Sequence, residues 1–476
     1  MSNVKIIIGP PGTGKTKRCI DIMEREMENG VEPEEIAFVS FTKKATQEAM
    51  QRVTQEFRLA QKDFPWVRTL HSMAFAAKGI KHDNVMSTQH YREIGRMLGI
   101  TFNNVSIDDI LEGNTSAKTS GDYFNYLHGF SRARKVSPET AWAMLECDQD
   151  VDWWEFKRYV KTVEEYKNDN GLIDFSDMLE VGNEYIPVKV AIIDEAQDLS
   201  TAQWTLAASL FRNAERIYIA GDDDQAIYTW SGADVKYFLQ MDGEREVLSQ
   251  SHRIPRAVHK IAGEIADRIT TRLPKQYKPR DEEGSVEFHS RIGEIDLSSG
   301  TWLLLARNSY MLGDLSKLCR DQGVAYSFKG GSSINKNHLK AISIWEGARK
   351  GITVNTAEAL FVESFMPLQY KDNWPKHLVW HEALTIIPFL EREYYISLLR
   401  RGEPITKEPR IHISTIHGIK GGEADNVALV TDISQRTFYS QEKNPDAEHR
   451  VWYVAATRAK QALHVIQPHT KHGYLI

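Results

Sequence analysis

The sequence has few cysteines, no long apolar run and no excess of positive charge. Its 476 residues include 3 cysteines, too few and too scattered for a disulfide framework or a cysteine-rich zinc site, so we expect a reducing compartment. No stretch approaches the roughly 18 apolar residues of a membrane-spanning helix, and the N-terminus has no secretory signal. A formal net charge of −6 excludes attachment to nucleic acid through bulk positive charge, but not through a local basic groove. We therefore expect a cytoplasmic protein with no membrane partner.

Short apolar runs rich in valine and isoleucine recur, each followed by a polar or glycine turn and a helical pattern. In the first half these runs are Val4–Ile8, Ile36–Ser40, Val188–Ile193 and Arg216–Ala220. In the second half they are Ser285–His289, Trp302–Ala306, Ile411–Ser414, Asn426–Val430 and Ala462–Ile466. Runs without clean alternation are typical of parallel strands covered on both faces. The two series predict an α/β protein with two domains, each built on a mostly parallel sheet.

Two long stretches do not fit the strand pattern and are predicted to be mainly helical insertions. In the first, Trp153–Lys167 places four apolar or aromatic residues at helical spacing, which predicts a core face. These four residues are Phe156, Tyr159, Val163 and Tyr166. The predicted organisation is a first α/β domain of residues 1–74 and 172–250 with insertion 75–171, and a second of residues 251–350 and 410–476 with insertion 351–409.

A phosphate-binding loop follows the first apolar run. The pattern G-x-x-x-x-G-K-[ST] is matched by Gly9, Pro10, Pro11, Gly12, Thr13, Gly14, Lys15 and Thr16. The loop lies between a predicted strand and a predicted helix, Lys17–Met27, as this motif requires. Its glycines let backbone N–H groups surround phosphates, while Lys15 reaches the β- and γ-phosphates and Thr16 binds Mg²⁺. A degenerate loop that does not hydrolyse nucleotide is the alternative.

Two adjacent carboxylates end the third apolar run. Asp194 is placed to hold Mg²⁺ through water, and Glu195 is placed to orient and deprotonate the attacking water. Two acids alone at a strand end are typical of a solvated turn. Together with the phosphate loop they favour a hydrolase over a degenerate loop.

The segments around these acids resemble known motifs. Asp194–Asp198 and Gly221–Ala233 resemble motifs II and III of superfamily 1A DNA helicases, the UvrD/Rep/PcrA group. Further resemblances, in family order, are Phe41–Ala45 to motif Ia, Thr69–Ser72 to Ib, Leu248–Arg253 to IV, Ser414–Glu423 to V and Tyr453–Lys460 to VI. The match runs from residue 9 to residue 460 and omits only the two insertions. The chain is therefore similar to a compact member of this group.

The resemblance implies two RecA-like P-loop NTPase domains with ATP and Mg²⁺ in the cleft between them. Arg253 and Arg458 match arginines that grip the γ-phosphate, a role that suits a permanently charged guanidinium. Gln225 matches a glutamine that senses the γ-phosphate, and Glu423 matches an acid near the ribose. We expect Lys15, Glu195, Gln225, Arg253 and Arg458 to act in catalysis.

The resemblance also implies contacts to single-stranded DNA. The matching residues are Phe41, Thr42, His71, Phe175, Tyr228 and Trp230. Aromatic side chains suit this role because every base presents a π-face. The alternative is that these aromatics belong to the core, as they do more often at strand ends. The segment Ser251–Arg280 carries eight lysines or arginines against two acids, which predicts a basic surface or ordinary solvated helix faces.

Three features depart from the family pattern. Ser231 occupies a position that is usually arginine, which weakens one predicted link between DNA and nucleotide. The second insertion is much shorter than the 2B subdomain of better-known members. The chain starts at its first strand, before which the family has a glutamine motif that reads adenine. Only Lys17 and His252 match positions that flank the base, so we expect ATP, dATP and GTP to be used with relaxed selectivity.

The sequence thus predicts an ATP-dependent DNA helicase or translocase that moves 3′→5′ on single-stranded DNA and separates duplex strands. Its expected partners are single-stranded and tailed double-stranded DNA and a loader or a replication or repair protein, in a bacterial or phage-infected cell. The alternative is a DNA-stimulated ATPase switch, or a regulatory DNA-binding module, that does not unwind duplex DNA.

Overall fold

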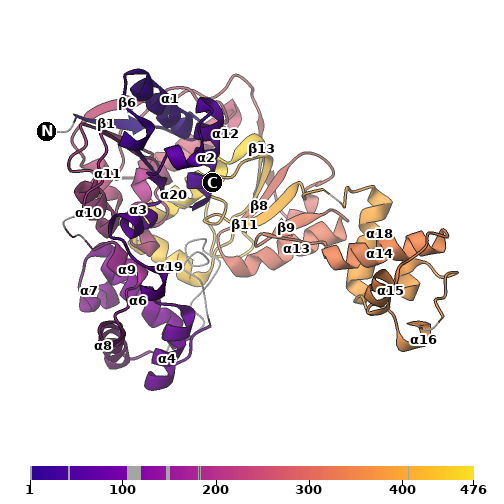
Figure 1. Ribbon diagram of the computed structural model, residues 1–476. Helices are drawn as coiled ribbons and strands as arrows, with labels where there is room; N and C mark the ends of the chain where they lie inside the picture. Colours follow the sequence, from indigo (N-terminus) through magenta and orange to yellow (C-terminus); the bar gives the residue numbers. More distant parts are fainter. Residues whose placement is uncertain are drawn as a thin grey trace. The chain divides into compact units, whose positions relative to one another are not determined.

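The computed structural model describes residues 3–40, 43–103, 119–145, 151–180, 182, 184–371, 373–405 and 407–476. The chain forms two compact units, which are described separately (Figure 1). The first unit comprises Met1–Ser285 and Arg436–Lys460, and the second comprises Val286–Gln435 and Gln461–Ile476. Among the described residues, no helix combines the length and apolar character needed to span a membrane.

The first unit is built on a six-stranded sheet. Its strands are β1 (Asn3–Ile8), β2 (Ile36–Val39), β3 (Val67–Arg68), β4 (Val190–Ile193), β5 (Arg216–Gly221) and β6 (Glu244–Val247). The order is β3-β2-β4-β5-β1-β6, and every neighbouring pair is parallel. The carboxyl ends of all six strands therefore lie along one edge of the sheet, where loops of an open α/β fold form sites.

Helices cover both faces of this sheet. Ile7 of β1 packs in a core with Cys19 and Met23 of α1, whereas Ile6 and Ile8 pack in a second core on the other face. The first face is covered by α1 (Lys15–Glu28) and α2 (Lys43–Phe57). The second face is covered by α3 (Leu70–Ala77), α9 (Phe175–Met178), α10 (Thr201–Leu210) and α11 (Val235–Leu239). The central strands are buried on both faces, as their unbroken apolar runs predict.

The first insertion is helical and has a core of its own. Its helices are α4 (Thr88–Leu98), α6 (Ser120–Arg134), α7 (Pro138–Met144) and α8 (Trp153–Asn170). Asp152 caps α8 by accepting hydrogen bonds from two backbone N–H groups, and Gly171 ends it at a φ of 61°. The predicted face of α8 is confirmed: three of its four residues are fully buried, and Tyr166 is half-buried and donates to Glu93.

Two segments from later in the sequence complete the first unit. Residues 251–285 carry α12 (Arg256–Ala266), and the returning segment carries α19 (Gln435–Lys443) and α20 (Pro445–Ala456). The motifs predict that both segments belong to the second α/β domain, and these domain limits stay a prediction. By packing, both belong to the first compact unit.

The second unit contains a seven-stranded sheet of order β10-β9-β11-β8-β12-β13-β7. These strands are β7 (Ser285–His289), β8 (Trp302–Ala306), β9 (Tyr326–Phe328), β10 (Gly331–Ser332), β11 (Ile411–Thr415), β12 (Ala424–Val430) and β13 (Ala459–Ile466). Strand β8 pairs in parallel with β11 and β12, and β11 with β9, while β10 is antiparallel to β9. The predicted α/β class with two mostly parallel sheets is confirmed.

The helices of the second unit form one continuous core with its sheet. They are α13 (Leu312–Asp321), α14 (Lys336–Arg349), α15 (Thr356–Glu363), α16 (Leu368–Lys371), α17 (Trp380–Ala383) and α18 (Phe389–Arg401). Trp345 of α14 and Leu398 of α18 are fully buried with Leu304 of β8. The region predicted as the second insertion is therefore helical and packs against the sheet that it interrupts.

Candidate functional site: a nucleotide site and an adjoining aromatic pocket

Three loops of the predicted nucleotide site leave the carboxyl edge of the first sheet. Strand β1 continues into the phosphate loop, β4 into Asp194 and Glu195, and β5 into Asp222–Gln225. Because β1 and β4 both pair with β5 in parallel, these loops lie side by side. The fold thus brings together motifs that are up to about 200 residues apart in sequence.

The phosphate loop has the backbone that its glycines permit. Gly12 and Gly14 have φ angles of 73° and 83°, in the left-handed region that favours glycine. The Gly9 N–H donates to the Gly221 carbonyl oxygen at 3.0 Å, and the Thr13 hydroxyl donates to the Pro10 carbonyl oxygen at 2.7 Å. Helix α1 starts at Lys15, so the loop ends at a helix N-terminus, which is suited to phosphate oxygens.

Lys15 and Thr16 contact the two carboxylates at the end of β4. The Lys15 Nζ lies 3.3 Å from Glu195 Oε1, and the Thr16 hydroxyl donates to Asp194 Oδ2 at 2.7 Å. Burial by itself lowers the pKa of Lys15, but the carboxylates of Glu195, Asp222 and Asp194 raise it above its ordinary value. Burial, together with the charge of Glu195, raises the pKa of Asp194 to about 6. A cation beside Asp194 would offset the cost of keeping this buried carboxylate ionised.

Glu195 is held in a defined orientation. Its backbone is left-handed, with a φ of 54°, a conformation that is uncommon for a residue with a side chain. The Gln197 amide donates to Glu195 Oε2 at 2.6 Å, and the Gln197 Oε1 accepts from the Asp222 N–H at 3.0 Å. Gln197 is fully buried and so ties the acids after β4 to the loop after β5. No role was predicted for Gln197 from the sequence, although it lies two residues after the predicted base.

The loop after β5 connects to the arginine of motif VI. Gln225 donates to Asp222 Oδ2 at 2.7 Å and accepts from Arg458 at 2.9 Å. Arg458 is 2% exposed and also donates to the Val454 carbonyl oxygen. The predicted pair of Gln225 and Arg458 is therefore in direct contact.

Arg253 lies against the phosphate loop. A Cβ atom at Gly12 would come within 2.4 Å of the Arg253 Cβ, so only glycine fits there. The Ser251 hydroxyl donates to the Pro11 carbonyl oxygen at 2.8 Å, and the His252 N–H donates to the Gly12 carbonyl oxygen at 2.9 Å. The structure thus brings Lys15, Thr16, Asp194, Glu195, Gln225, Arg253 and Arg458 into one region of the first unit.

The remaining predicted nucleotide contacts are Lys17, His252 and Glu423. Lys17 and His252 are exposed beside the phosphate loop. Glu423 belongs to the second unit, next to β12, and its role at the ribose stays a prediction.

A buried charge cluster supports the loop after β5. The Lys275 Nζ lies 2.8 Å from Asp222, 2.5 Å from Asp223 and 3.0 Å from Asp224, and its side chain is 1% exposed. Arg272 makes a two-pronged contact with Asp224 at 3.0 and 2.5 Å. Burial by itself lowers the pKa of Lys275, but the three aspartates raise it above its ordinary value. The predicted basic surface of residues 251–280 is therefore reduced, since two of its cations neutralise buried acids.

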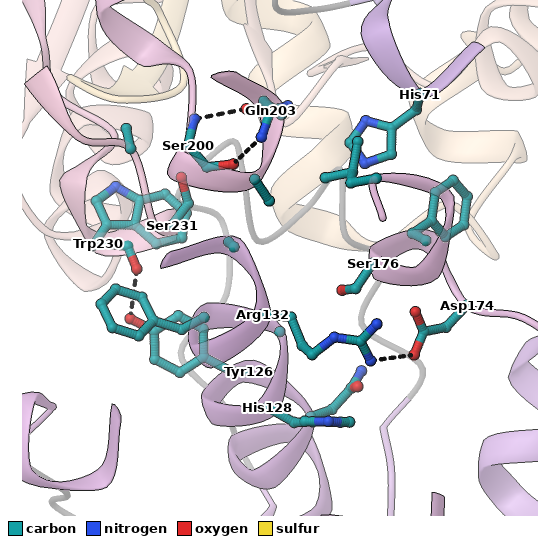
Figure 2. A pocket seen from close by; sticks show the side chains of 18 of the residues that line it. His71, Tyr126, His128, Arg132, Asp174, Ser176, Ser200, Gln203, Trp230 and Ser231 are labelled. Carbon is teal, nitrogen blue, oxygen red and sulfur yellow. Dashed lines mark hydrogen bonds and ion pairs between the residues drawn. The ribbon is translucent and has the colours of Figure 1, made fainter. Parts of the chain in front are cut away.

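Three of the predicted DNA contacts line one pocket of about 210 Å³ (Figure 2). His71 and Phe175 line it with their ring centroids 6.0 Å apart, and Trp230 also lines it. Phe175 is 47% exposed and Trp230 is half-buried, so both rings are open to a ligand. Tyr126 of α6, which the sequence analysis did not single out, donates to the Trp230 carbonyl oxygen at 2.8 Å.

The other predicted DNA contacts differ from these three. Tyr228 is buried behind Trp230, with ring centroids 6.3 Å apart, which favours the core role for its side chain. Ser231, at the position that is usually arginine, donates to the Tyr228 carbonyl oxygen and so stabilises the local turn. Phe41 and Thr42 lie outside the described residues.

Two protein-family models match this sequence, and known helicases are similar to it. The UvrD/REP helicase N-terminal domain matches residues 1–246, and the UvrD-like helicase C-terminal domain matches residues 372–470. The chain is 24% identical to a probable DNA helicase of Mycoplasma pneumoniae, over 98% of this chain and 80% of that protein. It is 24% identical to the ATP-dependent DNA helicase PcrA of Staphylococcus aureus, over 61% of this chain but only 42% of PcrA. A solved structure of PRRSV helicase shares 11% identity over 98% of this chain and 53% of its own, with a TM-score of 0.38.

The fold and the nucleotide site thus define a P-loop protein of the helicase class. The chain belongs to the UvrD/REP helicase family. The resemblance stated from the motifs, and the enzyme class that it implies, are confirmed.

We predict that Lys275→Met lowers the free energy of unfolding by about 3–5 kcal/mol, because it leaves three buried aspartates without their shared cation. Denaturant unfolding measures this change. Lys278→Met, on the same segment but exposed, is the control and should change stability by no more than about 0.5 kcal/mol. Equal stability of the two variants would contradict a supporting role for the cluster.

Proposed function

We propose that this protein is an ATP-dependent DNA helicase that moves 3′→5′ along single-stranded DNA and separates duplex strands. The proposal rests on three contacts at the carboxyl edge of the first sheet. They are Lys15 with Glu195, Thr16 with Asp194, and Arg458 with Gln225. These are the groups that phosphoryl transfer needs for charge balance and for positioning water. The domain limits predicted from the motifs, with 251–350 and 410–476 as the second RecA-like domain, belong to this proposal.

Thr16 and Asp194 are the residues that would hold Mg²⁺. A hydroxyl and a carboxylate 2.7 Å apart supply the hard oxygen ligands that Mg²⁺ prefers, and Asp194 is buried with a pKa raised to about 6. When bound, the ion would neutralise charge on the β- and γ-phosphates. Lys15 would contact the same phosphates from the start of α1, where backbone N–H groups also point toward them.

Glu195 is the proposed general base. Lys15 contacts one of its oxygens and Gln197 donates to the other, which fixes the plane of the carboxylate. A carboxylate held this way can orient a water for attack on the γ-phosphate and accept its proton. Arg253 and Arg458 then stabilise charge on the transferring phosphoryl group.

A short segment connects the nucleotide site to the aromatic pocket. Gln225 contacts Arg458, and Trp230, five residues later, lines the pocket. A change at the γ-phosphate that moves Gln225 therefore acts directly on the segment that carries Trp230. Helix α6 holds the same segment, since Tyr126 donates to Trp230 and Arg134 to Ala233. This arrangement supports coupling of hydrolysis to DNA grip.

The polarity of unwinding tests the proposal against its alternative, an ATPase switch that does not unwind. With ATP and Mg²⁺, we expect duplexes with a 3′ single-stranded tail to be unwound faster than duplexes with a 5′ tail, measured by strand release. Preference for the 5′ tail would contradict the direction of movement. DNA-stimulated hydrolysis with no release from either substrate would favour the switch.

Glu195→Gln should leave ATP binding intact and reduce kcat by about 10²–10⁴-fold, because only water activation is lost. Gln197→Leu should reduce kcat by a smaller factor, about 10²-fold, since it misplaces the base without removing it. Steady-state ATPase kinetics and nucleotide binding measure both effects. Gln276→Leu, at an exposed position, is the matched control and should keep normal turnover. Near-normal kcat in Glu195→Gln would show that another group is the base.

Trp230→Ala should weaken binding of single-stranded DNA by about 5- to 150-fold, which corresponds to one stacked base at about 1–3 kcal/mol. Basal ATPase should persist, because Trp230 lines the aromatic pocket and packs against Tyr126 and Tyr228. Fluorescence anisotropy with an oligonucleotide and ATPase assays with and without DNA measure the two effects. The control is Trp154→Ala, which removes an exposed tryptophan on α8 outside the pocket. Equal loss of basal and DNA-stimulated activity would favour a core role for Trp230.

A further inference from the structure

Two histidines and a glutamate lie close together on the two strands at one edge of the second sheet. His289 and Glu287 lie on β7, the strand at the edge of the sheet, and His464 lies on the neighbouring strand β13. The His289 Nε2 lies 3.0 Å from the His464 Nδ1. The Glu287 Oε2 lies 3.8 Å from the same His289 nitrogen and 3.5 Å from the same His464 nitrogen. Among the described residues, these three form the group whose ligand atoms all lie within 4.8 Å of one another.

These separations match those of ligands around one small cation. A point equidistant from three atoms at 3.0, 3.5 and 3.8 Å lies about 2.0 Å from each of them. Bonds from Zn²⁺ to histidine nitrogen and carboxylate oxygen are about 2.0–2.2 Å long, and tetrahedral ligands on such bonds are about 3.3 Å apart.

Neighbouring side chains surround the two histidines. The two rings are inclined by 27° with centroids 5.2 Å apart, and the centroid of the Trp302 ring lies 5.0 Å from that of His464. Their side chains are only 12–13% exposed, whereas Glu287 is half-exposed. The second nitrogen of His289 faces Glu294 Oε2 at 3.7 Å, and a carboxylate facing the second nitrogen is typical of a histidine that binds metal.

A hydrogen bond between the histidines is the alternative to a bound ion. The two nitrogens can share one proton, and the nitrogen that accepts it then presents no proton to the nearby Glu287 oxygen. A cation at the centre would instead bind both nitrogens and the carboxylate oxygen at once.

We propose that Glu287, His289 and His464 form a binding site for a divalent transition-metal ion of the zinc type, with its fourth position open to water. Two imidazoles select such an ion over Mg²⁺, which prefers oxygen ligands. The ion would join the edge strand β7 to β13 and so stabilise the second unit. This site is separate from the nucleotide site and does not depend on the proposed function.

The test is a titration of the full-length protein with Co²⁺, in the absence of nucleotide and with Mg²⁺ in excess. We expect the intense visible bands of a tetrahedral site at one Co²⁺ per chain, and their loss when Zn²⁺ is added. Zn²⁺ should also raise the melting temperature by about 2–4 °C. Absence of these bands at stoichiometric Co²⁺ would overturn the proposal.

Substitutions test which residues bind the ion. His289→Ala and His464→Ala should abolish the bands, and Glu287→Gln, which changes a half-exposed side chain, should weaken Co²⁺ binding at least about 10-fold. His412→Ala is the matched control, because His412 is an exposed histidine on β11 of the same sheet. Unchanged spectra in Glu287→Gln and His464→Ala, or loss of the bands in the control, would show that the ion binds elsewhere.

Discussion

The buried contact of Lys275 with three consecutive aspartates determines which parts of the chain build the nucleotide site. Asp222, Asp223 and Asp224 leave the end of β5 with no exposure to solvent, so their charges require buried cations. Lys275 and Arg272 supply these cations from a segment that follows motif IV, and Arg450 of α20 donates to the Asp223 carbonyl oxygen. The segments that make these contacts also carry Arg253, beside the phosphate loop, and lead to Arg458, beside Gln225. Charge neutralisation in the core thereby links the segments of the two arginines to the loop after β5.

Much of the fold could be predicted from the sequence because its signals are local. All nine predicted apolar runs correspond to strands, since valine-rich and isoleucine-rich segments between turns have few other structures available. The four strands that were not predicted lack this signal: β3 and β10 have two residues each, β9 has three, and β6, Glu244–Val247, is charged and largely exposed. Their pairing depends on neighbours that are distant in sequence, which no local pattern records.

Some residues of the functional site could likewise be predicted from local sequence, and others could not. The phosphate loop, Asp194 and Glu195 follow from a contiguous pattern, whereas Arg253 and Arg458 required the family resemblance. Gln197 could have been found, since it lies beside the base, but its bond to the Asp222 N–H depends on the tertiary structure. For Lys275 the sequence indicated only a positive charge. Because its side chain is buried, it supports the loop after β5 and does not contribute to a basic surface. Tyr228 was predicted to contact DNA, but its side chain is buried behind Trp230.

The left-handed backbone of Glu195 has a consequence for the evolution of this enzyme. A residue with a side chain at a φ of 54° costs the fold on the order of 1–3 kcal/mol, and glycine at this position would not incur that cost. A glycine there would also remove the carboxylate. A replacement that relieves the backbone strain would therefore remove the proposed base. The residue that we assign as the base is thus also a point at which activity and stability are opposed.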